Sequence, residues 1–457
     1  MSAITDHFLV QSSAKAKDLS HRQKINFNIS KYNAVVPNGK AQFENLELAR
    51  EKAKNVKWRA IEQLDVYLEK FESAFSKRGG KVIWAENAEE AIQAVLNICK
   101  EKNCKTLVKS KSMVTEEIHL NQALEKNNIA SIETDLGEYI QQLDGEAPYH
   151  IVTPAMHKSK EDVAALFAEK LGTDPSLTPE QLTLVARNIL RKKYVDAEVG
   201  VTGANFIISD IGGIAITENE GNARLSCAFP ETHIVIVGIE KVIPSIHDLA
   251  LFWPLLSTYG TGQQVTVYNT IVTGPRQPNE TDGPKEMYVI LLDNERTNIL
   301  QNPKQRESLY CIRCGACLNA CPIYKNIGGH SYGATYSGPI GSVITPNLEG
   351  MESFKHLSYA SSLCGNCTEV CSVKINLHEL LLENRHESVE KGYTHFTERM
   401  AWKAWKIASL HRKWMNLGNG QLKNKTASLL FKGWNKNRAD LQFSEKTFNQ
   451  LWKEKTK

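Results

Sequence analysis

The chain has no long run of apolar residues, and this absence restricts the cellular location that the sequence suggests. None of its apolar runs approaches the ~20 residues that a transmembrane helix needs. Residues Met1 to Gln23 lack the charged-then-apolar pattern of a secretory signal. We therefore expect a cytoplasmic protein, with peripheral contact to a membrane left open.

Two nucleotide-binding motifs are also missing. There is no Gly-x-Gly-x-x-Gly after an expected strand and no phosphate loop of the Gly-x4-Gly-Lys type, so a nucleotide site has little support. Cysteines are scarce outside two short runs: of the ten, only Cys99, Cys104 and Cys227 stand alone. This distribution argues for reduced thiols that hold a metal cluster rather than for a disulfide framework.

The composition is that of an ordinary globular protein, with 42% hydrophobic and 23% charged residues in 457, enough for two or three domains. The net charge of +4 conceals an asymmetry. From Lys391 to Lys457, fifteen Lys and Arg stand against four Asp and Glu, which gives +11 there and leaves −7 for the rest. An acidic body with a basic tail indicates that the tail meets something acidic.

The basic tail also carries five tryptophans, namely Trp402, Trp405, Trp414, Trp434 and Trp452. Basic residues with interleaved aromatics suit nucleic acid or a membrane surface. The commoner arrangement is a helical docking segment whose tryptophans pack on the body or on a partner protein, and we favour it.

The first cysteine run reads Cys311-Ile-Arg-Cys314-Gly-Ala-Cys317-Leu-Asn-Ala-Cys321-Pro322. This C-x2-C-x2-C-x3-C-P spacing is typical of bacterial iron–sulfur proteins. Three thiolates two residues apart on one loop can each reach a different iron of a cubic cluster, whereas the fourth points away. A structural zinc ion usually takes its four ligands as two separated pairs, so the spacing favours an iron–sulfur cluster.

A second run follows, Ser361-Ser-Leu-Cys364-Gly-Asn-Cys367-Thr-Glu-Val-Cys371-Ser372. Aligned from its end, it repeats the first run with Ser361 at the place of the first cysteine and Ser372 at the place of proline. Two such runs predict two clusters, most simply of the [4Fe–4S] type.

The fourth cysteine of each paired run ligates the other cluster. The predicted ligands of the first cluster are Cys311, Cys314, Cys317 and Cys371, and those of the second are Cys321, Cys364 and Cys367. One iron of the second cluster then lacks a cysteine. Ser361, water or a partner residue can fill that position, or loss of the iron leaves a three-iron cluster, so we expect the second cluster to be the more labile.

Residues 1–69 are expected to form an N-terminal helical extension, of which residues 1–40 show no clear period and are expected to be loosely docked. From Phe43 to Phe75, apolar residues recur at three- and four-residue steps, which predicts a helix that ends at Gly79-Gly80. Residues 70–300 are predicted to form an α/β domain, residues 301–385 a mostly helical ferredoxin-type cluster domain, and residues 386–457 the basic segment.

The α/β domain alternates expected strands with expected helices. The strands are expected at 82–84, 106–108, 130–133, 150–152, 206–209, 213–217, 233–238, 265–271 and 287–292, and the helices at 88–100, 116–125 and 178–194. The third helix opens with a capping box at Thr178 and Gln181. Such alternation implies a largely parallel sheet covered on both faces, and the last five strands, with few helices between them, predict an antiparallel part.

A glycine-rich stretch within this domain is the candidate binding site. It contains Gly200-Val-Thr-Gly203-Ala-Asn205 and, after an expected strand, Glu218-Asn219-Glu220-Gly221-Asn222-Ala-Arg224. Small residues let a backbone approach another backbone or a ligand, and α/β sheets place their sites just after strands. The candidate binding residues are Asn205, Glu218, Asn219, Glu220 and Arg224. The alternative is a polar hairpin end with glycine turns.

With the cysteine runs and this stretch both described, the chain resembles the lactate utilization protein B family over nearly its whole length. The sequences Gly-Val-Thr-Gly-Ala-Asn-Phe and Thr-Glu-Asn-Glu-Gly-Asn-Ala-Arg are specific to the lactate-utilization domain, which is related to the sugar-isomerase and CoA-transferase α/β fold. The resemblance implies an iron–sulfur subunit that, with two partner proteins, oxidises L-lactate to pyruvate and allows growth on lactate.

CoA-transferase relatives place a catalytic glutamate in a similar Glu-Asn-Gly turn. Here Glu220 separates Asn219 from Gly221, and this departure argues against a covalent role for Glu218. The resemblance therefore implies a binding or docking site without acyl transfer.

Two other functions compete with electron transfer. A hydroxy-acid enzyme can use an incompletely ligated cluster as a Lewis acid, and the missing eighth cysteine keeps this alternative open. A nucleic-acid-binding regulator with a sensing cluster rests only on the basic tail and is the weakest of the three.

Overall fold

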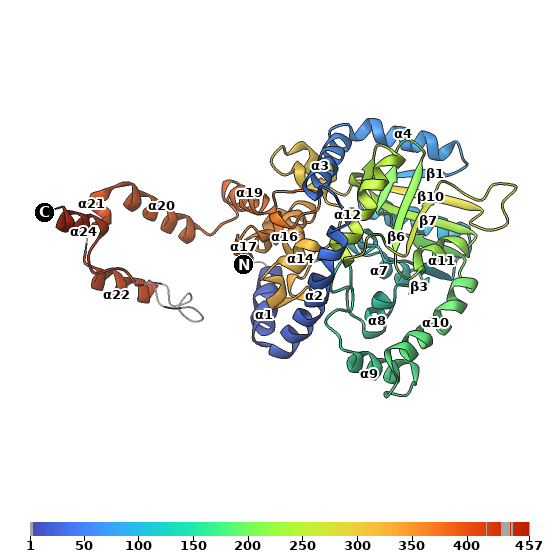
Figure 1. Ribbon diagram of the computed structural model, residues 1–457, viewed down its shortest axis with the longest axis horizontal. Coiled ribbons are helices and arrows are strands. Elements are labelled where there is room, and N and C mark those ends of the chain that lie inside the picture. The colour runs from blue at the N-terminus through green and yellow to red at the C-terminus, as the bar shows by residue number, and fades with distance from the viewer. Residues whose placement is uncertain (1–2, 417, 431–438, 440–441, 457) are drawn as a thin grey trace. The chain divides into compact units, whose positions relative to one another are not determined.

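The computed structural model describes residues 3–416, 418–430, 439 and 442–456 (Figure 1). The chain forms two compact units, Met1–Glu387 and Ser388–Lys457. The borders expected after residues 69 and 300 both fall inside the first unit, and they stay predictions.

A six-stranded parallel sheet organises the first unit. Its strand order is β1-β10-β7-β4-β2-β3, and all five pairings are parallel. The strands are β1 (Lys81–Ala85), β2 (Thr106–Lys109), β3 (Ala130–Glu133), β4 (Val199–Thr202), β7 (Thr232–Gly238) and β10 (Glu286–Leu292). The α/β class is therefore confirmed, with parallel pairing dominant.

The antiparallel pairing lies in a second sheet of order β8-β5-β6-β9, in which β6 pairs antiparallel with both neighbours. Its strands are β5 (Phe206–Ile208), β6 (Gly213–Glu218), β8 (Val242–Ile243) and β9 (Tyr268–Val272). The last strands of the α/β segment thus divide between two sheets, because β7 and β10 join the parallel sheet while β5, β6 and β9 do not.

Side chains alternate between the two faces of the parallel sheet, and both faces are covered. Ile234 and Ile236 of β7 pack in one apolar cluster with helices α5, α6 and α7, whereas Val235 and Val237 pack in another with the second sheet. The helices of the α/β segment are α5 (Ala88–Glu101), α6 (Met113–Glu117), α7 (Leu120–Lys126), α8 (Leu136–Asp144), α9 (Lys160–Leu171), α10 (Pro179–Asp196), α11 (Asn222–Ala228), α12 (Leu249–Thr261) and α13 (Arg296–Gln301).

Local sequence features explain several of these elements. The Thr178 side chain accepts from the Gln181 N–H and the Gln181 side chain accepts from the Thr178 N–H, so the expected capping box is confirmed. Gly200 lies in β4, where a Cβ would come within 1.9 Å of the Ser226 carbonyl oxygen. This glycine therefore permits a close approach of backbone to backbone.

The strand expected at 150–152 is wrong. These residues form bends in the connection between α8 and α9. Nδ1 of His150 accepts from the N–H groups of Val152 (3.1 Å) and Thr153 (3.2 Å). This local side-chain bonding takes up N–H groups that a strand would use in its ladder.

The expectation that residues 1–40 are loosely docked is also wrong. They form α1 (Ala3–Lys17) and α2 (Leu19–Lys40), and Ile25 and Ile29 are fully buried. The expected helix from Phe43 to Phe75 is divided at Gln63 into α3 (Leu46–Glu62) and α4 (Leu64–Ser76). The sequence showed no period in α1 and α2 because their apolar residues are not confined to one face, and Leu9, Val10, Leu19, Phe27 and Val35 are exposed.

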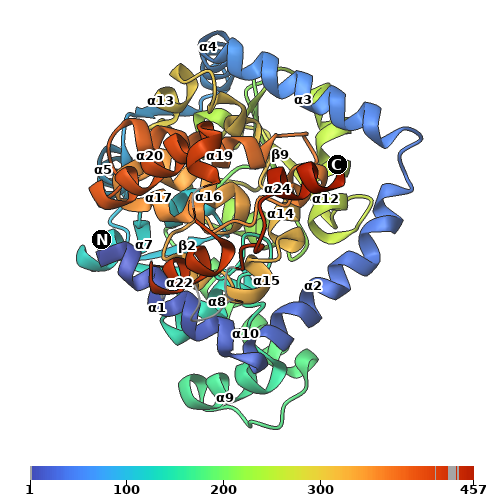
Figure 2. The same ribbon diagram turned by 90° about the vertical axis from the view of Figure 1, so that its left-hand side faces the viewer.

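The N-terminal helices lie along the outside of the cysteine-bearing segment (Figures 1 and 2). That segment is built from short helices joined by turns, as expected for a cluster-binding region. The helices of the cysteine-bearing segment are η3 (Arg306–Tyr310), α14 (Ala316–Ala320), α15 (Tyr324–Ile327), η4 (His330–Tyr332), α16 (Gly338–Leu348), α17 (Met351–Tyr359), α18 (Asn366–Glu369) and α19 (Leu377–Glu390). On α3, Arg50 donates to the carbonyl oxygens of Cys371 (2.8 Å) and Glu369 (2.7 Å).

The second unit contains α20 (Phe396–Leu410), α21 (Arg412–Met415), α22 (Gly420–Leu430) and α24 (Phe448–Lys455). Trp402, Trp405, Trp414 and Trp452 are exposed, whereas Trp434 lies outside the described residues. The docking role of the tryptophans stays a prediction. In the part of the chain that the structure describes, every helix is too short or too polar to cross a bilayer.

We expect Arg50→Ala to lower the free energy of unfolding by about 2–3 kcal/mol, because it removes charged hydrogen bonds to the buried carbonyl of Cys371 and the partly buried carbonyl of Glu369. The measurement is urea unfolding under anaerobic conditions. Lys52→Ala, at an exposed position of the same helix, is the control and should change it by less than about 0.5 kcal/mol. Equal effects of the two variants would contradict a clamping role for Arg50.

Candidate metal centre and adjoining cavity

Four cysteines from the two runs line one compact cavity. They are Cys311, Cys314, Cys317 and Cys371. The first three lie on the loop from η3 into α14, which turns through left-handed backbone at Arg313 (φ +61°) and Gly315 (φ +78°). The set is the one expected for the first cluster, although the ligand assignment itself stays a prediction.

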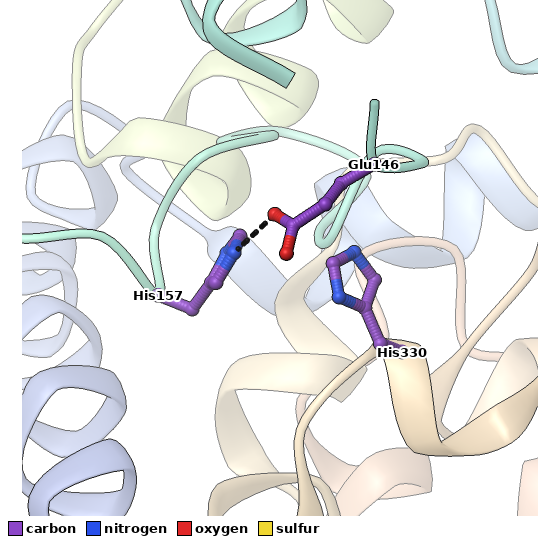
Figure 3. A group of neighbouring side chains, drawn as sticks. All are labelled: Glu146, His157 and His330. Atoms are coloured by element: carbon purple, nitrogen blue, oxygen red, sulfur yellow. Dashed lines mark hydrogen bonds and ion pairs between the residues drawn. The ribbon is translucent and has the colours of Figure 1, made fainter. Parts of the chain in front are cut away.

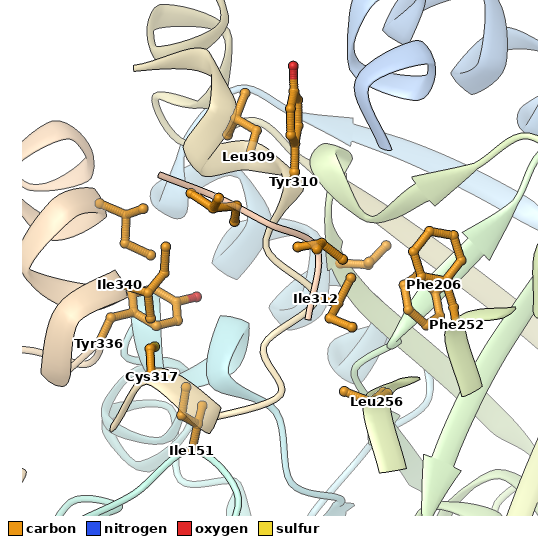
Figure 4. Close-up of a cluster of buried hydrophobic side chains, with 14 of the residues drawn as sticks. Ile151, Phe206, Phe252, Leu256, Leu309, Tyr310, Ile312, Cys317, Tyr336 and Ile340 are labelled. Atoms are coloured by element: carbon orange, nitrogen blue, oxygen red, sulfur yellow. The ribbon is translucent and has the colours of Figure 1, made fainter. Parts of the chain in front are cut away.

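The surroundings of these sulfur atoms suit an iron–sulfur cluster. Backbone N–H groups of Arg313 and Ile375 point at the sulfur atoms of Cys311 (3.4 Å) and Cys371 (3.3 Å). Hydrogen bonds to sulfur and burial are the means by which a protein adjusts a cluster's potential. Ile312 packs among Phe206, Phe252 and Leu256, and Cys317 lies near Ile340 (Figure 4).

The runs contain three further cysteines, Cys321, Cys364 and Cys367. They lie close enough together for the charge of one to shift the pKa of another. Burial and the neighbouring thiol of Cys321 raise the pKa of Cys367 to about 11, which favours the protonated thiol. A bound metal reverses this preference because it deprotonates its thiol ligands. Cys364 is exposed, so this second set reaches the protein surface.

Ser361 makes local contacts. Its hydroxyl oxygen accepts from the Leu363 N–H (3.1 Å), and its carbonyl oxygen accepts from Arg385 (3.2 Å). Asn366 donates to the Ala320 carbonyl oxygen (3.0 Å) and so joins the second run to the first. The role of Ser361 as a fourth ligand stays a prediction.

A cavity of about 530 Å³ adjoins the first cysteine set. One wall comes from the α/β segment, and the other comes from Ile312, Arg313, Cys314 and Tyr336 of the cysteine-bearing segment. Cys314 lines both the compact cavity and the large one. A molecule in the large cavity would therefore be in contact with the wall of the expected first cluster.

Four of the five expected binding residues line the large cavity, namely Asn205, Glu218, Asn219 and Glu220. Arg224 is exposed on α11 and is not part of that lining. The structure thus brings the glycine-rich stretch and the first cysteine run to one place, which their separation in sequence did not indicate.

Several of these side chains hold the backbone of the cavity wall. Glu218 accepts from the N–H groups of Ala223 (2.7 Å) and Arg224 (2.9 Å) at the start of α11, and its burial raises its pKa. Asn205 accepts from the Thr217 N–H (2.9 Å). These contacts account for both residues as parts of the turn.

Asn219 and Glu220 belong to the same turn and line the large cavity. Asn219 exchanges two hydrogen bonds of 3.0 Å with the Gln263 amide. Glu220 accepts from the Leu136 N–H (3.0 Å) at the start of α8. Glu220 is exposed at the mouth of the cavity, and partial desolvation of its carboxyl with the neighbouring Asp135 carboxylate raises its pKa to about 7.

Three cationic side chains in the lining were missed at the sequence level, namely Lys111, Lys241 and Arg313. Burial and the Arg313 charge lower the pKa of Lys241 to about 8. The Arg313 guanidinium stacks over Tyr336 at 4.5 Å, and its buried Nη1 has no hydrogen-bond partner among the described residues. The signal in the sequence that could have identified Arg313 was its position between two cysteines of the first run.

Known proteins resemble the chain in the same two regions. A family model described as the LUD domain matches residues 68–292, and one described as a 4Fe-4S dicluster domain matches residues 307–375. The second match shows that iron–sulfur clusters are the cofactors and supports the [4Fe–4S] type.

Curated relatives cover most of the chain. Lactate utilization protein B of Bacillus licheniformis is 47% identical over 367 residues, which cover 80% of this chain and 77% of the relative. The protein of the same name from Bacillus subtilis is 44% identical and covers 88% and 90%. A DUF162 family crystal structure from Deinococcus radiodurans aligns with 50% of this chain and 98% of its own at 12% identity, with a TM-score of 0.28 that is too low to compare the folds.

The raised pKa of Glu220 predicts a pH-dependent effect of Glu220→Gln. The folded protein binds this proton more tightly than the unfolded chain does, so the carboxylate costs stability increasingly as pH rises from its ordinary pKa of 4.5 to about 7. Glutamine stays neutral and still accepts from Leu136. We expect the variant to melt higher at about pH 8, by on the order of 1 °C, and the difference to shrink at about pH 5.5.

The measurement is thermal unfolding of both proteins at each pH. Glu125→Gln on the exposed face of α7 is the control and should show no such dependence. A Glu220→Gln difference that is constant with pH would contradict the raised pKa.

Proposed function

Because the chain belongs to the lactate utilization protein B family, we propose that it is the iron–sulfur electron-transfer subunit of a complex that oxidises L-lactate to pyruvate and allows growth on lactate. The observation that carries the proposal is Cys314, which lines both the compact four-cysteine cavity and the cavity of about 530 Å³. The proposed first cluster and the large cavity then share one wall.

The oxidation of L-lactate to pyruvate releases two electrons and two protons. When bound, the clusters supply one-electron transfer, at potentials anywhere between roughly −700 and +450 mV for this class. We assign Cys311, Cys314, Cys317 and Cys371 to the first cluster and Cys321, Cys364 and Cys367 to the second, with Ser361 at the remaining position.

The two cysteine sets differ in exposure, and this supports a path from the interior to the surface. Cys317 and Cys371 of the first set are buried and Cys314 of that set lines the large cavity, whereas Cys364 of the second set is exposed. The buried residues exclude water from the inner set and the exposed one offers a place for contact with a partner. Two other lactate-utilization proteins are the partners we propose.

The Lewis-acid alternative receives less support. It needs a substrate at the iron that lacks a cysteine, which belongs to the second set. The large cavity is lined by Cys314 and by none of Cys321, Cys364 and Cys367. A hydroxy acid bound there would meet the fully ligated set instead.

Cysteine variants test the ligand assignment. The anaerobically purified protein should contain about eight irons and eight sulfides. Cys317→Ser and Cys371→Ser should each lose only the first cluster, and Ser361→Cys should make the second more resistant to oxygen. Iron and sulfide analysis with EPR measures this. The crossed assignment is wrong if the parent holds a single cluster or if Cys371→Ser disturbs the signal that Cys364→Ser removes.

Growth tests the physiological role. Deleting the gene should abolish growth on L-lactate and spare growth on pyruvate, and the Cys317→Ser variant should fail to restore growth. In the purified complex, L-lactate should reduce the clusters, as followed by EPR. Unchanged growth on L-lactate, in a strain without another lactate dehydrogenase, would refute the role.

A further inference from the structure

Three side chains outside the cysteine sets converge at one point, namely Glu146, His157 and His330 (Figure 3). One potential ligand atom from each lies within 4.8 Å of the others. Glu146 and His157 belong to the connection between α8 and α9, whereas His330 begins η4 in the cysteine-bearing segment. The cluster therefore joins two segments that are far apart in the sequence.

The hydrogen bonds of the two imidazole rings leave nitrogen lone pairs available. Nε2 of His330 lies 2.7 Å from the Ala147 carbonyl oxygen, and a carbonyl can only accept, so this nitrogen carries the proton and Nδ1 carries the lone pair. Metal-binding histidines usually make such a bond from the ring nitrogen that does not bind the metal. Nδ1 of His157 is buried without a partner among the described residues, and Nε2 lies 3.0 Å from Glu146 Oε2.

The surroundings of His157 and Glu146 favour a neutral ring and an ionised carboxylate. Burial and the neighbouring His330 lower the pKa of His157 to about 4, so its ring is neutral at pH 7. Burial opposes ionisation of Glu146, but Lys158 and His157 outweigh it and lower the pKa of this carboxyl. Lys158 contacts Oε2 of Glu146 at 3.0 Å, and Oε1 remains for a metal ion.

Aromatic contacts hold the rings in place. The His157 ring stacks on Tyr149, with centroids 4.4 Å apart and planes at 20°. His330 meets the same tyrosine edge-on at 4.9 Å. The Tyr149 hydroxyl is hydrogen-bonded to Nε2 of His21 on α2 (2.8 Å). Such packing fixes both imidazoles before any ion arrives, which lowers the cost of binding.

We propose that Glu146, His157 and His330 form a binding site for a divalent first-row transition-metal ion of the Zn²⁺ type. Two imidazole nitrogens and one carboxylate oxygen are the donor set of zinc sites that keep a fourth position for water. Zinc bonds of about 2.0–2.2 Å place tetrahedral ligand atoms about 3.3 Å apart, and the ligand atoms here, all within 4.8 Å of one another, reach that spacing by side-chain adjustment. The ion would fasten the α8–α9 connection to η4.

This site is chemically distinct from the cysteine sets. Nitrogen and oxygen donors suit zinc and similar ions, whereas thiolates hold iron–sulfur clusters and also bind zinc. Zinc at this site therefore differs from zinc in an empty cysteine set by its nitrogen and oxygen ligands, which X-ray absorption distinguishes from sulfur. The alternative is a histidine–carboxylate hydrogen-bonded cluster that binds no metal.

The test uses the full-length protein with its clusters, purified anaerobically, treated with a mild chelator and titrated with Zn²⁺. We expect one zinc ion per chain by elemental analysis after removal of loosely bound ions, and a higher melting temperature with zinc. Glu146→Gln and His330→Gln should each weaken zinc binding by more than about tenfold while iron and sulfide contents stay unchanged. His247→Gln, at an exposed histidine on η2 (Ile246–Asp248), is the matched control and should bind zinc as the parent does.

Two results would overturn the proposal. One is a parent protein that retains no zinc and melts at the same temperature with and without it. The other is zinc retained equally by the parent and by Glu146→Gln. If a histidine variant fails to fold, X-ray absorption at the zinc edge of the loaded parent decides, because two nitrogens and oxygen in the first shell support the site and sulfur ligands refute it.

Discussion

The guanidinium of Arg296 is buried at 1% exposure and sets how the two sheets and the cysteine-bearing segment meet. It forms ion pairs with Glu117 of α6 (2.9 Å) and with Glu240 after β7 (2.6 Å). Tyr336 donates to Glu117 (2.6 Å), and Arg313 lies 3.6 Å from Glu240. Removing one member of such a network leaves another charge buried and unpaired, which typically costs about 3–5 kcal/mol.

The surroundings of Arg296 leave it little freedom. A Cβ at Gly238 would come within 2.1 Å of Glu240 Oε2 and 2.5 Å of Arg296 Nε, so a larger residue there would displace this ion pair. Burial opposes the ionisation of Glu240, but Arg296 and the other nearby cations lower its pKa to about 2. Since Arg313 and Tyr336 also line the large cavity, the same network shapes the wall that separates that cavity from the first cysteine set.

The two cysteine sets lie in different surroundings, one mostly enclosed by the fold and the other at the surface. The parallel sheet and the second sheet supply one side of the cavity, and the cysteine loop closes the other side. The N-terminal helices contact the cysteine-bearing segment from outside, and Arg50 of α3 donates to the carbonyl groups of Glu369 and Cys371 in the second cysteine run. Cys317 and Cys371 are thus buried and Cys314 lines the large cavity, whereas Cys364 is exposed, an arrangement that fits transfer between a bound molecule and a partner.

The sequence by itself determined what depends on local spacing. The cysteine runs indicated the cofactor, the capping box at Thr178 indicated a helix start, and the alternation of expected strands with expected helices indicated the α/β class. The family resemblance, which rests on such motifs, is confirmed by relatives of 44–47% identity. Each of these features involves residues within a few positions of one another, so a linear pattern records them.

Only the tertiary structure decided which distant segments meet. It brought Cys371 to the first run, Glu220 and Arg313 to one cavity, and His330 to His157. It also docked the two N-terminal helices, whose apolar residues are spread over more than one face, so that no period marks the ones that contact the cysteine-bearing segment. Contacts of this kind depend on how whole elements pack, because burial and charge pairing act across space, and no spacing along the chain encodes them.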